Sequence, residues 1–292
     1  MFTGSMVAIV TPFKNNGAEL DRDKLTELVE FHIKNGTSAI VPCGTTGESA
    51  TLSTEEHEAV IDIVIEAAAG KIPVIAGTGS NNTKEAIEIT KHAKEAGADA
   101  ALIITPYYNK PTQEGVYQHF KALSDAVDIP FIAYNIASRT GINITPQTMA
   151  RLATIKNVVG VKEASGNLGQ MSDIRLLCGE GFDLISGDDG LTLPLMAIGG
   201  CGVISVVANI VPKDSADMVS AFRKGDIEKA RELHYKLSPL VDAMFIETNP
   251  IPVKTAMGMM GMIEPSLRLP MCEMLPENKA KLEKALKDYG LI

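Results

Sequence analysis

The sequence contains no tryptophan, and it has only four cysteines and five histidines among its 292 residues. The cysteines lie far apart and form neither a C-x-x-C pair nor a disulfide framework, so we expect reduced thiols. The four are Cys43, Cys178, Cys201 and Cys272. The histidines show no metal-ligand spacing and are interpreted as ordinary surface or core residues. The sequence therefore predicts neither a metal centre nor a disulfide-stabilised scaffold.

Positive charge is also scarce, because 27 lysines and arginines face 36 aspartates and glutamates and leave a formal charge of -9. A protein that binds nucleic acid irrespective of sequence needs a basic face, and this balance argues against one. No apolar run reaches the roughly 18 to 20 residues that span a bilayer. The first residues, MFTGSMVAIVTPF, show no basic region and no cleavage pattern of a signal peptide. We therefore expect a cytoplasmic protein with no membrane partner.

The chain does contain a regular alternation of apolar runs and amphipathic stretches. Eight near-continuous apolar runs are typical of parallel strands covered on both faces. They span residues 5–12, 38–44, 72–79, 100–106, 129–135, 158–163, 182–187 and 202–208. Helical patterns follow the first three runs, over 21–36, 53–70 and 82–97, and each ends in glycine. The second helix opens with the capping-box spacing of Ser53 and Glu56.

Each strand with its helix occupies about 25 to 35 residues, which is the size of one βα unit. Eight such units in succession favour a closed (β/α)8 TIM barrel, in the α/β class, over an open sheet. We expect the catalytic barrel to span residues 1–225 and a C-terminal helical extension, residues 226–292, to pack on it. In such barrels the chemistry lies at the carboxyl ends of the strands and in the loops that follow.

Polar residues follow several of the predicted strands. GTTGES (44–49) supplies hydroxyl and N–H groups that would hold a carboxylate, although this segment taken alone favours a plain strand-to-helix turn whose threonines form local hydrogen bonds. Three of the six tyrosines, Tyr107, Tyr108 and Tyr134, fall at strand ends, where a single tyrosine is usually a rim residue. In SGDDG (186–190) the two acids suggest a metal site, but we interpret Asp188 as a helix cap.

Lys162 interrupts the apolar run VVGVKE and is the most informative residue of the chain. Strand alternation places Gly160 and Lys162 on one face, and we expect the glycine to leave room for the lysine side chain inside the barrel. A lysine in an apolar mouth loses hydration, so its pKa falls, and its neutral amine attacks ketones to form a Schiff base. The alternative is a solvated lysine paired with Glu163.

Eight segments together resemble the dihydrodipicolinate synthase and N-acetylneuraminate lyase superfamily of pyruvate-using class I aldolases. They are GTTGES, AGTGSNNT, ITPYYNKPTQEG, YNIASRTG, VVGVKEASGN, LISGDD, GVISVVAN and NPIPVK, in the order and spacing of the family. The resemblance covers nearly the whole chain. The SRTG segment with Arg139 is similar to that of the synthases, and the sialic-acid lyases lack this pattern.

The resemblance implies that Lys162 forms an imine with pyruvate and that the derived enamine attacks L-aspartate-4-semialdehyde, the committed step of diaminopimelate and lysine biosynthesis. Tyr134 would shuttle protons, linked to Thr45 and Tyr108 in a hydroxyl relay. Arg139 would bind the carboxylate of the semialdehyde. Three residues would border the pyruvate pocket: Thr46, which would hold the carboxylate, Gly187 and Ile204. The iminium is the electron sink, so no cofactor is implied.

The resemblance also implies an oligomer, a homotetramer built as a dimer of dimers, in which Tyr107 reaches across a subunit interface. Members inhibited by L-lysine bind it at this interface. The matching residues here are Ser49, Ala50, His57, Gly79, Asn81, Glu85 and Tyr107, and Glu85 would pair with the ammonium group of the effector. Thr54 stands where some lysine-sensitive members have a second histidine. Alternatively, His57 and Glu85 are ordinary helix-surface residues.

The chain departs from the synthase pattern at Ala137, where proline is usual, so we expect a working but less preorganised loop around Arg139. Two other functions stay open at the level of the sequence. A related aldolase for 2-keto-3-deoxy sugar acids would keep Lys162 and Tyr134 but would not need Arg139. A non-catalytic barrel that senses keto acids or lysine would need neither Lys162 nor Tyr134.

Overall fold

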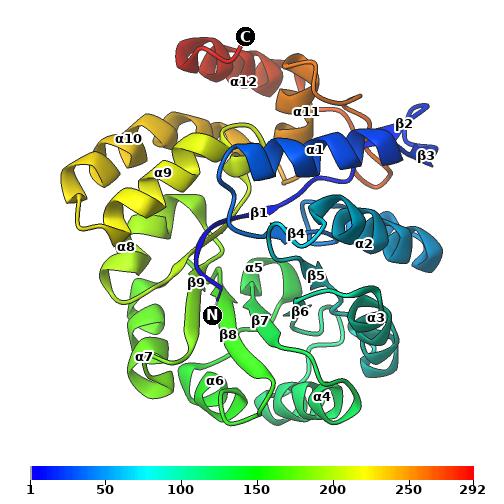
Figure 1. Cartoon of the computed structure of the whole chain (residues 1–292), viewed down its shortest axis with the longest axis vertical. Coiled ribbons are helices and arrows are strands. Elements are labelled where there is room, and N and C mark those ends of the chain that lie inside the picture. The colour runs from blue at the N-terminus through cyan, green and yellow to red at the C-terminus, as the bar shows by residue number, and fades with distance from the viewer. Residues whose placement is uncertain (1) are drawn as a thin grey trace.

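The structure is a computed structural model that describes residues 2–292. Parallel strands form its centre and helices surround them (Figure 1). Eight strands of this part of the chain form the main sheet: β1 (Gly4–Ala8), β4 (Ile40–Val41), β5 (Ile75–Gly77), β6 (Ala100–Ile104), β7 (Phe131–Asn135), β8 (Val158–Glu163), β9 (Asp183–Ser186) and β10 (Gly202–Ser205). Consecutive strands are neighbours and β1 also pairs with β10. A bridge between Ile40 and Val74 joins the two remaining edges, so the predicted TIM barrel is confirmed.

Helices and short elements connect these strands. The α-helices are α1 (Arg22–Lys34), α2 (Thr54–Ala68), α3 (Thr83–Ala96), α4 (Gln113–Ala126), α5 (Ala137–Thr140), α6 (Pro146–Leu152), α7 (Leu168–Cys178), α8 (Thr192–Ala197), α9 (Pro212–Arg223), α10 (Ile227–Met244), α11 (Ile251–Met259) and α12 (Pro276–Tyr289). Three 3-10 turns are present within residues 2–292: η1 (Ser49–Thr51), η2 (Asp189–Leu191) and η3 (Val207–Asn209). A hairpin of β2 (Phe13–Lys14) and β3 (Glu19–Leu20) was not predicted, because two-residue strands give too short a pattern.

The first helices begin and end at the predicted signals. Ser53 and Glu56 form the reciprocal capping box of α2, and Gly97 ends α3 in the left-handed conformation. Asp188 caps η2 as predicted, since its carboxylate accepts the N–H of Gly190 at 2.9 Å. The last predicted strand (202–208) is shorter than expected because Val207 begins η3.

The barrel interior is filled by a single buried cluster with residues from every strand of the main sheet. Its larger members are Met6, Val41, Ile75, Leu102, Ile132, Tyr134, Ile185 and Ile204, with Val159 packed against them. The alternate residues of β7, Phe131 and Ala133, join a different cluster outside the barrel. This inside-outside alternation follows from the two-residue repeat of a strand.

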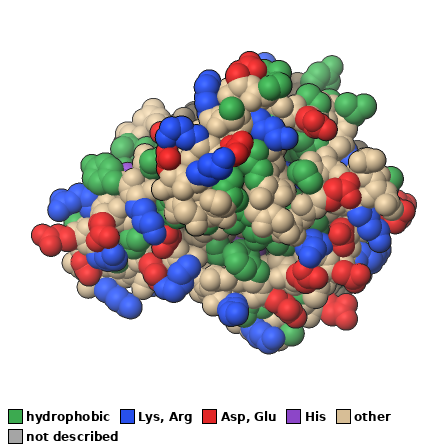
Figure 2. Space-filling view, turned by 90° about the horizontal axis from the view of Figure 1, so that it is seen from above, with side chains coloured by type: hydrophobic (Ala, Val, Ile, Leu, Met, Phe, Trp, Pro, Cys, Tyr) green, Lys and Arg blue, Asp and Glu red, His purple; other side chains and the backbone are tan. Residues whose placement is uncertain are grey.

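Helices α10, α11 and α12 contribute to a third cluster, which also contains residues of β1, α1 and α2. Leu240 and Leu286, for example, share this cluster with Val7 and Val29. The predicted boundary at residues 225 and 226 falls between α9 and α10, and α12 lies at one end of the molecule (Figure 1). Charged side chains of both signs are mixed over the face shown in Figure 2. Within residues 2–292, every helix is too short or too polar to cross a bilayer.

Candidate active site

A cavity of about 410 Å³ opens at the carboxyl ends of β4 to β7. Its wall combines residues from the loop after each of these strands with residues of the C-terminal part of the chain. Its members include Thr45, Gly77, Ile104, Tyr134, Arg139, Asn249, Pro250 and Met271. Carboxyl ends of parallel strands meet at one rim of a barrel, which is why segments so distant in sequence share this cavity.

Lys162 lies directly behind the wall of this cavity, with only 5% of its surface exposed. It is the strand partner of Tyr134, and its Nζ lies 4.3 Å from the centre of the Tyr134 ring. Burial lowers the pKa of Lys162 to about 8; the carboxylate of Asp189 raises that pKa and Arg139 lowers it. A larger share of this amine is therefore neutral near neutral pH than for a solvated lysine.

The space for this lysine is provided by Gly187 and not by Gly160. A Cβ atom at Gly160 would lie 2.6 Å from the carbonyl oxygen of Asp183, so this glycine is required by the close approach of β9. A Cβ atom at Gly187 would lie 3.2 Å from both Cγ and Cε of Lys162. The predicted role of Gly160 was therefore wrong, because strand alternation identifies the face but not the neighbour that fills it.

Glu163 is not the ion partner of Lys162. The next residue of a strand points to the opposite face, and the Glu163 carboxylate accepts the side-chain N–H of Asn135 at 2.9 Å and the backbone N–H of Ser165 at 2.8 Å. Burial raises the pKa of Glu163, while these hydrogen bonds lower it. The solvated-lysine alternative is thus contradicted by the burial of both residues.

Tyr134 and Thr45 are brought together. Thr45 and Tyr134 both line the cavity, and the Thr45 hydroxyl is close enough to the Tyr134 phenol to lower its pKa. Burial raises the pKa of Tyr134 to about 12, while Arg139 and Thr45 lower it. The phenol therefore keeps its proton at neutral pH and can donate it to a neighbouring oxygen or nitrogen.

The remaining predicted substrate contacts lie around this pair. Ile204 belongs to the interior cluster with Tyr134, and Gly187 contacts Lys162 as described. Thr46 is buried, and its Oγ1 accepts a hydrogen bond of 3.0 Å from Asn249 Nδ2. Arg139 reaches the cavity from α5 and donates through Nη2 to the backbone oxygen of Asn249 at 3.0 Å.

The two adjacent tyrosines take different positions. Tyr107 is 37% exposed and lines the cavity, whereas Tyr108 is 89% exposed and has a left-handed backbone with φ of 71°. Within one chain, Tyr108 therefore stands in solvent, apart from Tyr134 and Thr45. The hydroxyl relay of these three residues stays a prediction.

Most of the residues predicted to bind lysine line the same cavity. Ser49, Ala50, His57, Gly79, Glu85 and Tyr107 line it. Asn81 donates from Nδ2 to the backbone oxygen of Tyr107 at 3.1 Å. The Glu85 carboxylate accepts from the Ser80 hydroxyl, and Nε2 of His57 is 2.7 Å from the Gly77 oxygen. Burial lowers the pKa of His57, which is therefore held neutral.

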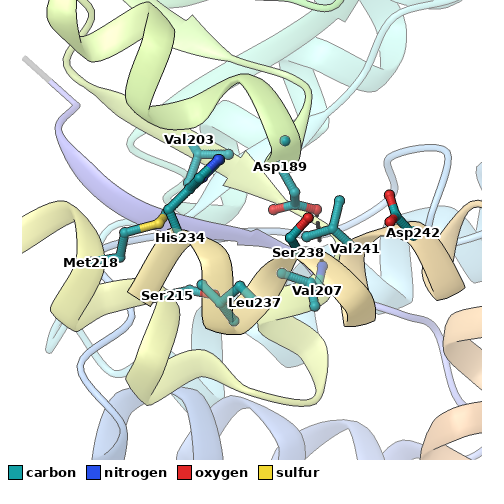
Figure 3. A pocket seen from close by; sticks show the side chains of 11 residues that line it. Asp189, Val203, Val207, Ser215, Met218, His234, Leu237, Ser238, Val241 and Asp242 are labelled. Atoms are coloured by element: carbon teal, nitrogen blue, oxygen red, sulfur yellow. Dashed lines mark hydrogen bonds between the residues drawn. The ribbon is translucent and has the colours of Figure 1, made fainter. Parts of the chain in front are cut away.

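Sequence reasoning missed Asp189, which is buried beside Lys162. Its Oδ2 accepts the backbone N–H of Val206 at 2.9 Å and of Val207 at 3.1 Å, so it joins the ends of β9 and β10. Asp189 also borders a second cavity of about 80 Å³ between α9, α10 and the barrel, together with Ser215 and His234 (Figure 3). The signal for Asp189 in the sequence was its position next to Asp188. Two adjacent acids do not indicate which of them is buried.

Known proteins resemble this chain along its whole length. The model of the dihydrodipicolinate synthetase family matches residues 1–289. A 4-hydroxy-tetrahydrodipicolinate synthase of Syntrophus aciditrophicus (strain SB) is 59% identical over 292 residues, 100% of both chains. The crystal structure of dihydrodipicolinate synthase from Aquifex aeolicus matches with a TM-score of 0.97 and 54% identity over 99% of each chain. The synthase of Cyanidioschyzon merolae with lysine bound has a TM-score of 0.96 and 42% identity, covering 100% of this chain and 99% of that one.

Proposed function

This chain belongs to the dihydrodipicolinate synthetase family, and we propose that it condenses pyruvate with L-aspartate-4-semialdehyde to 4-hydroxy-tetrahydrodipicolinate. The observation that carries the proposal is a buried lysine amine with a lowered pKa, 4.3 Å from the ring centre of Tyr134 at the barrel mouth. The names of the relatives support the synthase over the sugar-acid aldolase and the sensor. The reaction is the committed step of diaminopimelate and lysine biosynthesis.

The chemistry follows from a neutral amine in a buried site. Nζ of Lys162 adds to C2 of pyruvate, and loss of water gives the imine. The imine draws electrons from the methyl carbon, which loses a proton to form the enamine. This carbon then attacks the aldehyde, whose oxygen takes up a proton. Finally the amine of the semialdehyde attacks the imine carbon, which closes the ring and releases the lysine amine.

Each site residue has a role within this sequence. Tyr134, protonated at neutral pH, donates to and recovers protons from the departing and forming hydroxyl groups, and Thr45 orients its phenol. Thr46 holds the carboxylate of pyruvate beside Gly187 and Ile204. Arg139 binds the carboxylate of the semialdehyde, because a planar guanidinium contacts both carboxylate oxygens. Tyr108 completes the relay towards solvent, in keeping with its exposed position on a single chain.

The direct test is covalent trapping. The parent chain is incubated with pyruvate and reduced with borohydride, and the mass of the protein is measured by mass spectrometry. Lys162→Ala is the matched control. We expect one reduced pyruvyl group on Lys162 in the parent and none in the variant. Consumption of pyruvate only when aspartate semialdehyde is present identifies the synthase. A parent chain that forms no adduct would refute the proposal.

We also propose a homotetramer in the cytoplasm that is inhibited by L-lysine bound in the cavity beside Glu85 and Tyr107. The acidic Glu85 beside the cavity offers a partner for the effector ammonium. Sedimentation velocity tests the assembly, and Glu85→Gln tests the effector site. We expect this variant to need at least tenfold more lysine for half inhibition, with kcat unchanged. Inhibition identical to the parent would place the effector elsewhere.

A further inference from the structure

A short segment of the C-terminal part of the chain contacts the loops of the candidate active site at three points. At its start, Asn249 donates to Thr46 Oγ1 and accepts from Arg139, each at 3.0 Å. One turn into α11, Nζ of Lys254 donates to Glu48 Oε1 at 2.6 Å. Thr46 and Glu48 belong to the same turn after β4. The C-terminal segment is therefore hydrogen-bonded to the loop that carries Thr46, the predicted contact of the pyruvate carboxylate.

Lys254 is buried like Lys162, but its amine is engaged in an ion pair, a hydrogen bond and a contact with an aromatic ring. Its side chain is 0% exposed and that of Glu48 is 2% exposed. Nζ also donates to the backbone oxygen of Thr11 at 3.0 Å and lies 4.1 Å from the centre of the Phe13 ring. Burial lowers the pKa of Lys254 to about 8, and the Glu48 carboxylate raises it. The partners show that this amine serves structure and not Schiff-base chemistry.

Glu48 uses both carboxylate oxygens, since its Oε2 accepts the backbone N–H of Arg268 at 3.1 Å. The guanidinium of Arg268 lies 4.3 Å from the centre of the same Phe13 ring and forms two hydrogen bonds with Glu56, of 2.6 and 2.7 Å. The buried ion pair is therefore the centre of a cluster that holds the first turn of α2, the hairpin strand β2 and the C-terminal segment together.

The backbone of Glu48 shows why this anchor matters for the active site. Glu48 has φ of 52° and ψ of 36°, a left-handed conformation that is unfavourable for any residue with a Cβ. It closes the threonine turn, residues 44–48, in which its N–H donates to the Thr45 oxygen at 3.1 Å. Strained conformations of this kind persist only where the surroundings fix them. This one is fixed at the backbone by the N–H and hydroxyl of Thr51, which both donate to the Glu48 carbonyl oxygen at 3.0 Å, and at the side chain by the contacts of the Glu48 carboxylate.

We propose that Lys254 and Glu48 are positioning residues, whose buried ion pair fixes the threonine turn and thereby places Thr45 beside Tyr134 in the wall of the active-site cavity. The inference rests on the proposed function, because it assigns these residues a part in the same reaction. Lys254 does not line the active-site cavity, and the carboxylate oxygens of Glu48, which borders it, accept hydrogen bonds from Lys254 and Arg268. Their effect is transmitted through Thr45, and this makes the inference testable by coupling between two substitutions.

The experiment measures kcat for the full chain as Lys254→Met, Thr45→Val and the double variant of both. If Lys254 acts through Thr45, Lys254→Met lowers kcat roughly ten- to hundredfold in the parent, but less than twofold in the Thr45→Val background. A purely structural role gives losses that multiply. Multiplicative losses, or parent kcat for Lys254→Met, would overturn the inference.

A matched control is Lys236→Met in α10. Lys236 also pairs with an acid, Asp214, and also lies over an aromatic ring, that of Tyr289 at 4.8 Å, but it is half-exposed and does not line the active-site cavity. We expect this control to keep the parent kcat.

A lone buried Glu48 carboxylate is strongly unfavourable, so the experiment includes a second variant in which no buried charge is left unpaired. Glu48→Gln combined with Lys254→Met removes both charges. We expect this pair to melt near the parent temperature, to form the pyruvate adduct and still to lose kcat at least tenfold. Parent kcat in this folded pair would equally refute the positioning role. Failure of the parent itself to trap pyruvate would instead refute the proposed function.

Discussion

Nζ of Lys162 lies 4.3 Å from the centre of the Tyr134 ring, and the two residues occupy paired positions on β8 and β7. One buried space therefore holds both a nucleophile and an acid. Burial moves their pKa values in opposite directions, down to about 8 for the lysine and up to about 12 for the tyrosine. Both shifts favour the neutral form, which is the form that the reaction needs from each group at the start.

The first prediction concerns the pH dependence of pyruvate trapping. Only the neutral amine adds to the ketone, so the rate should rise about tenfold per pH unit below the pKa of Lys162 and level off above about pH 8. Tyr134 stays protonated over this range, because its pKa is about 12. Borohydride trapping at a fixed low pyruvate concentration from pH 6 to 10 gives the profile. A rate that still rises tenfold per unit above pH 9 would indicate an ordinary solvated lysine.

The second prediction is that Lys162→Met is more stable than the parent at pH 6.5. A lysine pKa that is lowered from 10.5 to about 8 on folding corresponds to an unfavourable contribution of about 3 kcal/mol while the amine is charged. This cost applies in full below pH 8, and it is lost as the pH rises from 8 to 10.5. We therefore expect a higher urea midpoint for the variant at pH 6.5 and a smaller gain at pH 9.5.

The control for this measurement is Lys156→Met, whose side chain is 80% exposed and pairs with Asp128 at the surface. It should change the free energy of unfolding by no more than about 0.5 kcal/mol. A Lys162→Met variant that is less stable than the parent at pH 6.5 would show that the ammonium group is well accommodated in the folded state.

Sequence alone predicted the barrel and the burial of Lys162, because both follow from short-range patterns of apolar residues. A charged residue inside an apolar run of six residues can be identified without tertiary contacts, and so can the alternation of eight such runs with helices. The ion pair of Lys254 with Glu48 joins residues 206 positions apart, and no local pattern indicates that partnership. Asp189 was missed for the same reason, since its partners Val206 and Val207 lie on the next strand unit.

Gly187 gives a third prediction, in which added volume displaces the reactive amine. A Cβ atom there would lie 2.8 Å from Cβ of Ala164 and 3.2 Å from Cε of Lys162, so Gly187→Ala must shift the lysine. Misplacement of a reacting atom by about 1 Å costs up to roughly a hundredfold in rate. We expect a loss of kcat and of trapping rate in the range of ten- to hundredfold, with the melting temperature little changed.

Gly181→Ala is the matched control, because a Cβ atom at Gly181 has no neighbour within 4 Å among residues 2–292. This substitution precedes the same strand, β9, and should leave both rates at the parent value. If Gly187→Ala traps pyruvate as fast as the parent, the lysine has more freedom than these distances allow.

The fourth prediction concerns Ala137, the first residue of α5, two positions before Arg139. Proline is favoured at this helical position, whose N–H has no partner inside the helix. The preceding residue, Ile136, has φ of -142° and ψ of 78°, outside the helical region that a following proline disfavours. Ala137→Pro is therefore compatible with the backbone and should restrict the unfolded and open forms of the loop.

Such a restriction is worth about 0.4 to 1 kcal/mol, which corresponds to about two- to fivefold in an equilibrium constant. Because Arg139 is assigned to the semialdehyde, we expect Ala137→Pro to lower the KM for the semialdehyde by about this factor and to leave the KM for pyruvate unchanged. Ala137→Gly should act in the opposite direction, since it loosens the same turn. Steady-state kinetics with each substrate varied in turn measures both constants. If neither substitution alters the KM for the semialdehyde, the bond from Arg139 to the Asn249 oxygen already fixes the guanidinium, and the residue at position 137 has no part in substrate binding.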